Sequence, residues 1–394
     1  MRTPKTPPMK TCTLQCLASA ALAGVLSASP SARASEQATL KDAYKGAFLV
    51  GAALNDSQFT EEDARAVAII KAQFNAISPE DCLKWQQVHP EPGVYDFSRA
   101  DRYVEFGLRN GMFVVGHNLV WHNETPKWVF EDNKGNPADR ETLLARMRDH
   151  ILTVVGRYKG KIKGWDVVNE ALSYDGSMTK TPWERIIGDD YVLKAFQFAH
   201  EADPGAELYY NEFYYYHEFS RLSPAKRDGA IALVKKLQSQ GVHIAAVGLQ
   251  GHYGLEAPTL GDVEETITMF ARLGVKVSIT EMDIDVLPAV KESEFAEQPM
   301  HIPLNPSIDP YTAGLPDSLQ QRLARRYADL FKVFLKHRDV IERVSFWGVD
   351  DGASWLNMFP VYGRTNHPLL FDRSYNPKPA FDAVVSVART ASAN

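Results

Sequence analysis

Short apolar runs alternate with amphipathic stretches along most of the chain. Runs of four to eight residues rich in Val, Ile, Leu and aromatic side chains are typical of buried strands. Between them, apolar residues recur at helical spacing, as in Leu144, Met147 and Ile151, or Leu330 and Phe334. Eight runs are expected to form strands, at residues 48–54, 74–78, 112–118, 162–169, 207–211, 244–250, 275–280 and 344–348.

Eight strands alternating with helices over about 350 residues predict an α/β fold of the (β/α)8 TIM barrel type. The competing fold is an open doubly wound sheet. The glycine-rich fingerprints of nucleotide-binding sheets are missing from the sequence, which leaves that alternative without support. Residues 287–316 contain six prolines and are expected to form a long loop within the barrel pattern.

The first 34 residues differ from the rest of the chain. Arg2, Lys5 and Lys10 precede an apolar run at about residues 14–28, and Ala-Arg-Ala at 32–34 fits a cleavage site. The apolar run is short for a membrane span. We therefore expect a cleavable secretory signal peptide at 1–34, a single catalytic barrel domain at 35–394, and a secreted or periplasmic protein.

Charge and cysteine content narrow the range of partners. The 34-residue leader carries four basic residues and no acidic one, so the remainder has a formal net charge of −10. This acidity argues against nucleic acid or an anionic membrane as a partner, and a neutral substrate fits better. Cys82 is the only cysteine after the leader, so no internal disulfide is expected and its thiol is interpreted as a buried small group. The domain is expected to be a monomer.

Polar and aromatic residues collect where the expected strands end, which is where the active site of such a barrel lies. Two of them, Glu170 and Glu281, fall on opposite arcs of the ring. Paired carboxylates can act as acid and nucleophile on a glycosidic bond, amides suit sugar hydroxyls, and indoles suit pyranose faces. The ring comprises Glu80, Asp81, Lys84, His117, Trp121, Asn169, Glu170, Asn211, Glu212, Gln250, His252, Glu281, Asp283 and Trp347.

Seven motifs in order along the chain make the pattern specific. They are P-E-D-C-L-K-W, G-H-N-L-V-W-H, W-D-V-V-N-E, G-L-Q-G-H, I-T-E-M-D-I, F-W-G-V-D-D and L-L-F-D. On these motifs the chain resembles glycoside hydrolase family 10, the endo-β-1,4-xylanases, from about residue 44 to 388. The resemblance implies an endo-1,4-β-xylanase that acts on xylan or xylo-oligosaccharides and needs no cofactor or metal.

The resemblance also implies a role for each site residue. Glu170 would be the acid/base and Glu281 the nucleophile, in a double displacement that retains the anomeric configuration. Such a reaction predicts carboxyl groups about 5 to 5.5 Å apart, with Glu170 holding a proton and Glu281 ionised. His252, oriented by Asp283, would contact Glu281, and Asn169 would bind the sugar 2-hydroxyl. Glu80, Lys84, His117, Trp121 and Gln250 would line the glycone subsites, and Trp347 and Trp355 would close over the sugar.

Three further acidic residues lie on or near the segments that carry the expected site. Asp166 precedes Glu170 by four residues, about 13 Å along a strand, so it is expected toward the other end of the barrel, in a stabilising role. Asp81 stands where the family commonly has Asn, and Glu124 where Gln is usual. Both lie near expected glycone subsites.

Three other functions fit the same residues. A related retaining β-glycanase, such as a glucanase or mannanase, would use the same acid pair, and a transglycosylase would use the same intermediate. A xylan-binding barrel without catalysis belongs to a different class, and the presence of both glutamates argues against it.

Overall fold

The computed structural model describes residues 39–213, 224–290 and 303–392. The expected signal peptide and part of the proline-containing 287–316 stretch lie outside the described residues. The strands within them are β1 (Leu49–Leu54), β2 (Ala76–Pro79), β3 (Phe113–Val120), β4 (Gly164–Asn169), β5 (Glu207–Glu212), β6 (Ala246–Leu249), β7 (His252–Gly254), β8 (Lys276–Asp285) and β9 (Ile341–Phe346).

Eight parallel strands close into a barrel, which confirms the predicted (β/α)8 fold. Strands β1 to β6 pair with their neighbours in sequence order, β6 pairs with β8, and β9 completes the ring by pairing with both β8 and β1. All eight predicted strands are present, although the last begins at Ile341 rather than residue 344. The three-residue strand β7, which pairs with the end of β8, was not predicted.

The strands are apolar because the barrel buries them on both faces. All six residues of β4 are buried, including Trp165. The ring of Trp165 packs directly against Gly116 of β3, where an added Cβ would meet it at 2.1 Å. Glycine is therefore required at position 116. The prediction that Cys82 is buried is also confirmed, and Trp85 is buried as well.

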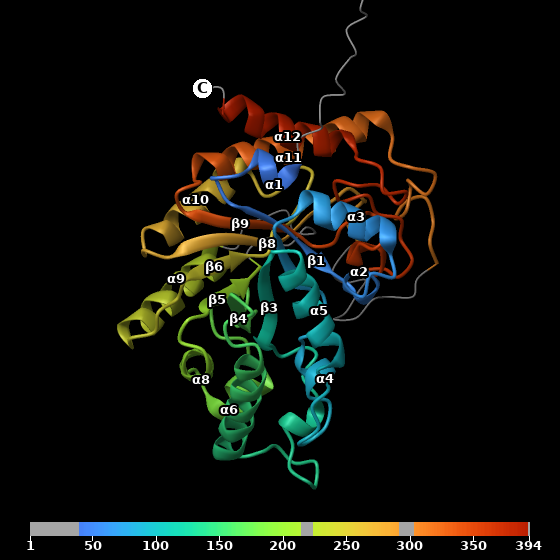
Figure 1. Cartoon of the computed structure of the whole chain (residues 1–394). Helices are drawn as coiled ribbons and strands as arrows, with labels where there is room; N and C mark the ends of the chain where they lie inside the picture. Colours follow the sequence, from blue (N-terminus) through green and yellow to red (C-terminus); the bar gives the residue numbers. More distant parts are fainter. Residues whose placement is uncertain (1–38, 214–223, 291–302, 393–394) are drawn as a thin grey trace, which may run out of the picture. The chain divides into compact units, whose positions relative to one another are not determined.

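Helices surround the barrel, as Figure 1 shows for α3, α5, α6, α8, α9, α10 and α11. The α-helices in the described residues are α1 (Leu40–Ala43), α2 (Asp56–Phe59), α3 (Ala64–Gln73), α4 (Trp85–Val88), α5 (Ser98–Arg109), α6 (Arg140–Arg157), α7 (Pro182–Ile187), α8 (Tyr191–Ala202), α9 (Pro224–Ser239), α10 (Leu260–Ala271), α11 (Asp317–Lys336) and α12 (Pro379–Ser392). None of these helices is long and apolar enough to cross a membrane.

The helical stripes predicted from the sequence face the barrel. In α6 the buried side chains include Met147, Ile151 and Val154, and the residue that begins the stripe is Leu143 rather than the half-buried Leu144. The first and last helices meet, because α1 packs against α12 and the Tyr44 hydroxyl donates to the Val384 carbonyl at 2.8 Å.

Candidate active site

The polar residues predicted at strand ends lie at one mouth of the barrel. Asn169 ends β4, Glu170 directly follows β4, Gln250 follows β6, and Glu281 lies within β8. Because the strands are parallel, their carboxyl ends open at the same face, and this face carries the active site in barrel enzymes. The site therefore forms from residues that are far apart in sequence.

Glu170 is half-buried and held by two donors. Its Oε2 accepts from Trp121 Nε1 at 2.9 Å, and its Oε1 accepts from Gln250 Nε2 at 2.8 Å. Its backbone has a φ of 56°, a left-handed conformation that costs a non-glycine residue roughly 1 to 2 kcal/mol. Trp121 and Gln250 were expected to line sugar subsites, and the structure shows that both also fix the expected acid/base.

Glu281 is more deeply buried than Glu170, with only 5% of its surface exposed. Its Oε1 accepts from Asn211 Nδ2 at 2.7 Å, and its Oε2 lies 3.3 Å from His252 Nε2. The two carboxylates thus differ in environment. Glu170 remains accessible to water, whereas Glu281 is packed within the barrel mouth.

His252 and Asp283 form the pair expected from the resemblance. They are register partners on β7 and β8, and His252 Nδ1 lies 3.0 Å from Asp283 Oδ1. Burial alone would lower the pKa of His252, but Asp283 and then Glu281 raise it to about 10. The ring is therefore an imidazolium at neutral pH and can donate to both carboxylates.

Asn211 is a site residue to which the sequence assigned no role. Its Nδ2 donates to both Glu281 Oε1 and, at 2.9 Å, Asn169 Oδ1, and its own Oδ1 accepts from Thr280 at 2.7 Å. The available signal was an Asn-Glu pair that recurs at the carboxyl ends of β4 and β5. The second glutamate of these pairs, Glu212, does not join the site, because it forms a buried ion pair of 2.9 Å with Lys226.

Asn169 connects the two halves of the site. Its Oδ1 accepts from Asn211, and Gln250 Nε2 lies 3.4 Å from the same oxygen. These contacts use the carbonyl end of the side chain. Its NH2 group has no acceptor in the described part of the chain and remains available for a hydroxyl group of the substrate.

His117 was expected to line a glycone subsite, but its side chain is buried below the surface of the site. Only 3% of its surface is exposed, its Nδ1 lies 2.9 Å from Asp166 Oδ2, and Asn118 Nδ2 lies 3.2 Å from its Nε2. Trp347 packs edge to face on it, with centroids 5.4 Å apart. Asp166 is therefore the residue that fixes His117.

Lys84 pairs with both residues at which the sequence departs from the family pattern. Its Nζ donates to Asp81 Oδ1 at 2.7 Å and to Glu124 Oε1 at 3.2 Å. Burial would lower the pKa of Lys84, but these two carboxylates raise it. Glu80 lies half-buried beside them, and the nitrogen of Lys84 lies 5.3 Å from the centre of the Trp121 ring.

Trp355 reaches the site from a loop beyond β9. Its Nε1 donates to Asp283 Oδ2 at 2.7 Å, and its ring lies 4.9 Å from that of His252. Trp347 also contacts His252, edge to face at 6.4 Å. Both indoles are half-buried, so each presents part of its surface at the mouth.

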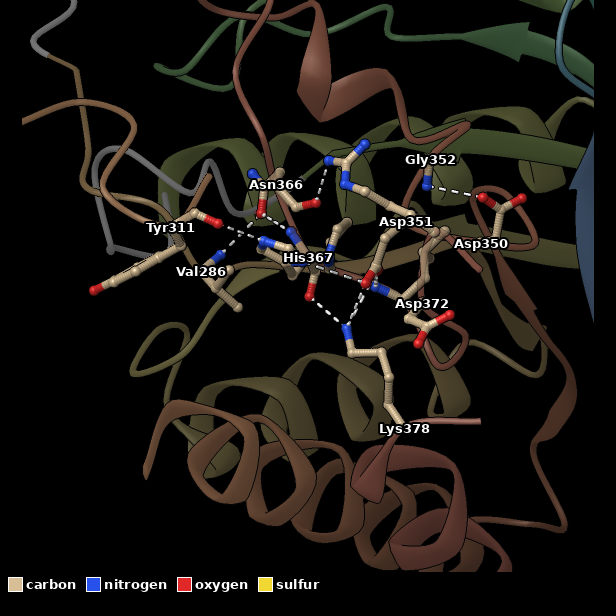
Figure 2. A network of polar contacts seen from close by, with 12 residues as sticks. Val286, Tyr311, Asp350, Asp351, Gly352, Asn366, His367, Asp372 and Lys378 are labelled. Atoms are coloured by element: carbon tan, nitrogen blue, oxygen red, sulfur yellow. Dashed lines mark hydrogen bonds and ion pairs between the residues drawn. The ribbon is translucent and has the colours of Figure 1, made fainter. Parts of the chain in front are cut away.

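A buried polar network holds the loop that carries Trp355 (Figure 2). Lys378 donates to both oxygens of Asp351, at 2.9 and 3.2 Å, and to the His367 carbonyl at 2.7 Å. Asn357 Nδ2 donates to the Asp351 carbonyl at 2.8 Å, and Asn366 N donates to Asn357 Oδ1 at 2.9 Å. The network fixes the ends of the turn on which Trp355 stands.

No cluster of three or more His, Cys, Asp or Glu side chains in the described residues is arranged to hold a metal ion. The site instead contains two carboxylates of unequal burial, joined through the amides of Gln250, Asn169 and Asn211. One carboxylate can transfer protons with the solvent while the other, beside an imidazolium, stays ready to attack an electrophilic carbon. On a (β/α)8 barrel with indoles at its mouth, this combination defines a glycoside hydrolase.

The comparison with known sequences agrees with this class. The chain belongs to glycosyl hydrolase family 10, whose sequence profile matches residues 39–387. It is 45% identical over 354 residues to endo-1,4-beta-xylanase A of Xylanibacter ruminicola, covering 90% of this chain and 94% of the relative. It is 40% identical over 356 residues to the beta-1,4-xylanase of Dictyoglomus thermophilum, covering 90% and 92%.

The fold is shared with solved structures. A GH10 endoxylanase retrieved from a sugarcane soil metagenome superposes with a TM-score of 0.83 at 44% identity. The match covers 89% of this chain and all of that structure. The resemblance noted in the sequence motifs therefore extends to the whole barrel.

Proposed function

We propose that the protein is an endo-1,4-β-xylanase that cleaves internal β-1,4-xylosidic bonds with retention of configuration. The observation that carries the proposal is the unequal pair of carboxylates, with Glu170 half-buried under Trp121 and Gln250 and Glu281 buried against Asn211 and His252. Relatives up to 45% identical are named xylanases, and one similar solved structure holds a mutant in complex with xylotriose.

The first step breaks the glycosidic bond. Glu170 donates its proton to the bridging oxygen, and the Glu281 carboxylate attacks the anomeric carbon to form a glycosyl-enzyme ester. The His252 imidazolium and the Asn211 amide donate to Glu281 and hold its carboxylate in position. The Asn169 NH2 group is placed to bind a hydroxyl of the sugar undergoing cleavage.

The second step releases the sugar. Glu170, now ionised, takes a proton from water, and the resulting nucleophile attacks the anomeric carbon and displaces Glu281. Two inversions give net retention. Water reaches the ester because Glu170 lies on the exposed side of the pair, and a second sugar can enter by the same route, so transglycosylation competes with hydrolysis.

Kinetics on short substrates test the reaction. Wild-type protein should release the β-anomer from xylohexaose, as followed by proton NMR, and Glu281→Ala should retain xylan binding without turnover. Glu170→Ala should lose xylan hydrolysis yet still form the intermediate from an aryl xylobioside with a good leaving group, because that step needs no acid. Release of the α-anomer, or turnover by Glu281→Ala, would refute the proposed mechanism.

The competing functions give different results in the same assays. An aryl cellobioside adds a hydroxymethyl group to each sugar, which Trp347 and Trp355 leave little room to accommodate if they cover the glycone. Equal or faster cleavage of the cellobioside would favour a glucanase over a xylanase. Xylan binding with no turnover by wild-type protein would identify a binding barrel.

We also propose that the protein is exported with removal of residues 1–34. The support is the basic start, the short apolar run and the Ala-Arg-Ala site in the sequence. N-terminal sequencing of protein from the culture medium or periplasm tests this proposal. A chain that begins at Met1 in those fractions would contradict cleavage.

A further inference from the structure

The Lys84 cluster, defined as Glu80, Asp81, Lys84 and Glu124, contains one cation and three carboxyl groups. Lys84 is nearly buried, and its nitrogen bonds to both Asp81 and Glu124. Gln86 fixes the second carboxylate, because its Nε2 donates to Glu124 Oε2 at 2.8 Å and its backbone N donates to the Glu124 carbonyl at 3.0 Å. The arrangement is therefore built by several contacts.

The cluster presents negative charge toward solvent. The side chains of Asp81 and Glu124 are 50% and 31% exposed, whereas that of Lys84 is 10% exposed. Two carboxylates more than neutralise the lysine. A charged group that approaches from solvent meets these more exposed acids before it meets the buried cation.

Glu80 lies in the same local field. Burial and then Asp81 raise the pKa of Glu80 to about 8, although Lys84 opposes them. Within the described residues its carboxyl group makes no hydrogen bond or ion pair. Asp350, which is 3% exposed and has one oxygen without a partner in the described residues, adds to the negative field at Glu80. Figure 2 shows that Asp350 stands apart from the Lys378 and Asp351 pair, with its other oxygen bound by Gly352 N.

The cluster lies next to the reacting groups. Lys84 Nζ is 5.3 Å from the centre of the Trp121 ring, and Trp121 Nε1 donates directly to Glu170. One aromatic side chain thus separates the cluster from the expected acid/base. A polysaccharide that passes over Trp121 brings the side groups of its neighbouring sugars within reach of Asp81 and Glu124.

We propose that the Lys84 cluster makes this enzyme select by charge, so that xylose residues carrying a uronic acid are excluded from the glycone side of the site while neutral side groups are admitted. The inference rests on the proposed xylanase function and specifies its substrate. The positions excluded are those next to Trp121, on the side that the family resemblance assigns to the glycone.

The size of the effect follows from simple electrostatics. Two like charges about 6 Å apart, at an effective dielectric between roughly 20 and 80, change a rate by about 3- to 100-fold. We expect the uronate to lower kcat/KM by about 10-fold. The charges are partly exposed, so about 0.5 M salt should remove most of the difference in kcat/KM between acidic and neutral substrates.

The test compares substrates that differ only in the carboxyl group. Glucuronoxylan oligosaccharides with one side group on the glycone side are paired with the same molecules after reduction of the uronic acid to the neutral sugar. Wild-type protein should cleave the reduced substrate about 10-fold faster. On the acidic polymer it should leave one more undecorated xylose between the side group and the new reducing end than it leaves on the reduced polymer.

The variant Asp81→Asn/Glu124→Gln keeps the size of both partners and their oxygen contacts with Lys84. It removes the two exposed negative charges beside Lys84 and leaves Glu80 as the remaining carboxyl group of the cluster, so the acidic-to-reduced ratio of kcat/KM should rise at least 10-fold. Glu201→Gln/Asp329→Asn removes the same total charge at exposed ion pairs on α8 and α11, and should leave both the ratio and the activity unchanged.

The outcomes separate this inference from the proposed function. Equal cleavage of acidic and reduced substrates by wild-type protein, or an unchanged ratio in Asp81→Asn/Glu124→Gln, overturns the inference, provided that xylohexaose is hydrolysed. The same shift in the Glu201→Gln/Asp329→Asn control overturns it too, because net charge would then be the cause. No turnover of xylohexaose overturns both.

Discussion

The indole nitrogen of Trp355 donates a hydrogen bond of 2.7 Å to Asp283, on the oxygen opposite the one that faces His252. The contact joins a loop beyond β9 to the residue that orients the imidazolium beside Glu281. A tryptophan expected only to cover the sugar therefore also supports the nucleophile.

Replacing Trp355 by Phe keeps an aromatic surface but removes the donor to Asp283. Loss of a hydrogen bond to a charged group costs about 1.5 to 3 kcal/mol, so kcat for xylohexaose should fall by roughly 10- to 100-fold. Trp128→Phe is the matched control, because Trp128 also donates to an oxygen, the Pro90 carbonyl at 2.9 Å, outside the site. An equal loss of kcat in both variants would indicate a general effect of removing an indole.

Replacing Asn211 by Ala removes a donor from both Glu281 and Asn169. Preorganised donors to reacting groups are worth about 10²- to 10³-fold in rate, and we expect kcat to fall by about 100-fold with little change in xylan binding. Single-turnover kinetics with an aryl xylobioside should place the loss in formation of the intermediate. Asn110→Ala, which removes a comparable donor to the Phe106 carbonyl at the end of α5, should retain full rate.

Replacing Lys378 by Met leaves Asp351 buried without its cation. Removing one partner of a buried ion pair typically costs about 3 to 5 kcal/mol, measurable as the free energy of unfolding in urea. The additional change Asp351→Asn should recover part of the loss, because the remaining group is neutral. Lys332→Met breaks an exposed pair with Asp329 and should cost less than about 1 kcal/mol. Equal costs for Lys332→Met and Lys378→Met would contradict the role assigned to burial.

The buried pair His89 and His150 predicts that acid weakens the fold. Their Nδ1 atoms lie 3.3 Å apart, and His150 stacks on Trp85 with centroids separated by 3.6 Å. Burial lowers the pKa of His89 to about 4 and that of His150 well below 6.5. The unfolded chain therefore binds more protons below pH 6.5, so the stability present above that pH is lost as the pH falls toward 4.

His150→Phe removes one titrating group and preserves the stack on Trp85. Between pH 7 and pH 5 the free energy of unfolding should drop by about 2 kcal/mol less in this variant than in wild-type protein. His243→Gln alters an exposed histidine and should follow the wild-type curve. Parallel curves for His150→Phe and wild type would show that His150 does not control the acid response.

The strands were predictable because a closed parallel barrel buries both of their faces and so requires continuous apolar runs. Positions at strand ends then located Glu170, Glu281, His252 and Asp283, and the structure brings them together. Strand β7 escaped prediction because three residues, His252–Gly254, form no pattern of their own.

The contacts between site residues depend on register, which the sequence does not state. His117 lies opposite Asp166, and Asn169 opposite Asn211, as direct partners on neighbouring strands. The sequence predicted that Asp166 lies away from Glu170 along its own strand, but it did not predict that the adjacent strand places His117 beside Asp166. Which side chains meet is decided by the stagger between strands.

Closure of the barrel between β1 and β9 limits how far the chain can fold during its synthesis. Leu49 pairs with Arg343, so the first strand has no permanent partner on one edge until almost the whole chain has been synthesised. At about 5 to 20 residues per second, this interval is on the order of 15 to 60 seconds. During that time the edge of β1 that pairs with β9 has no partner strand, so the barrel cannot close before the last strand has been made.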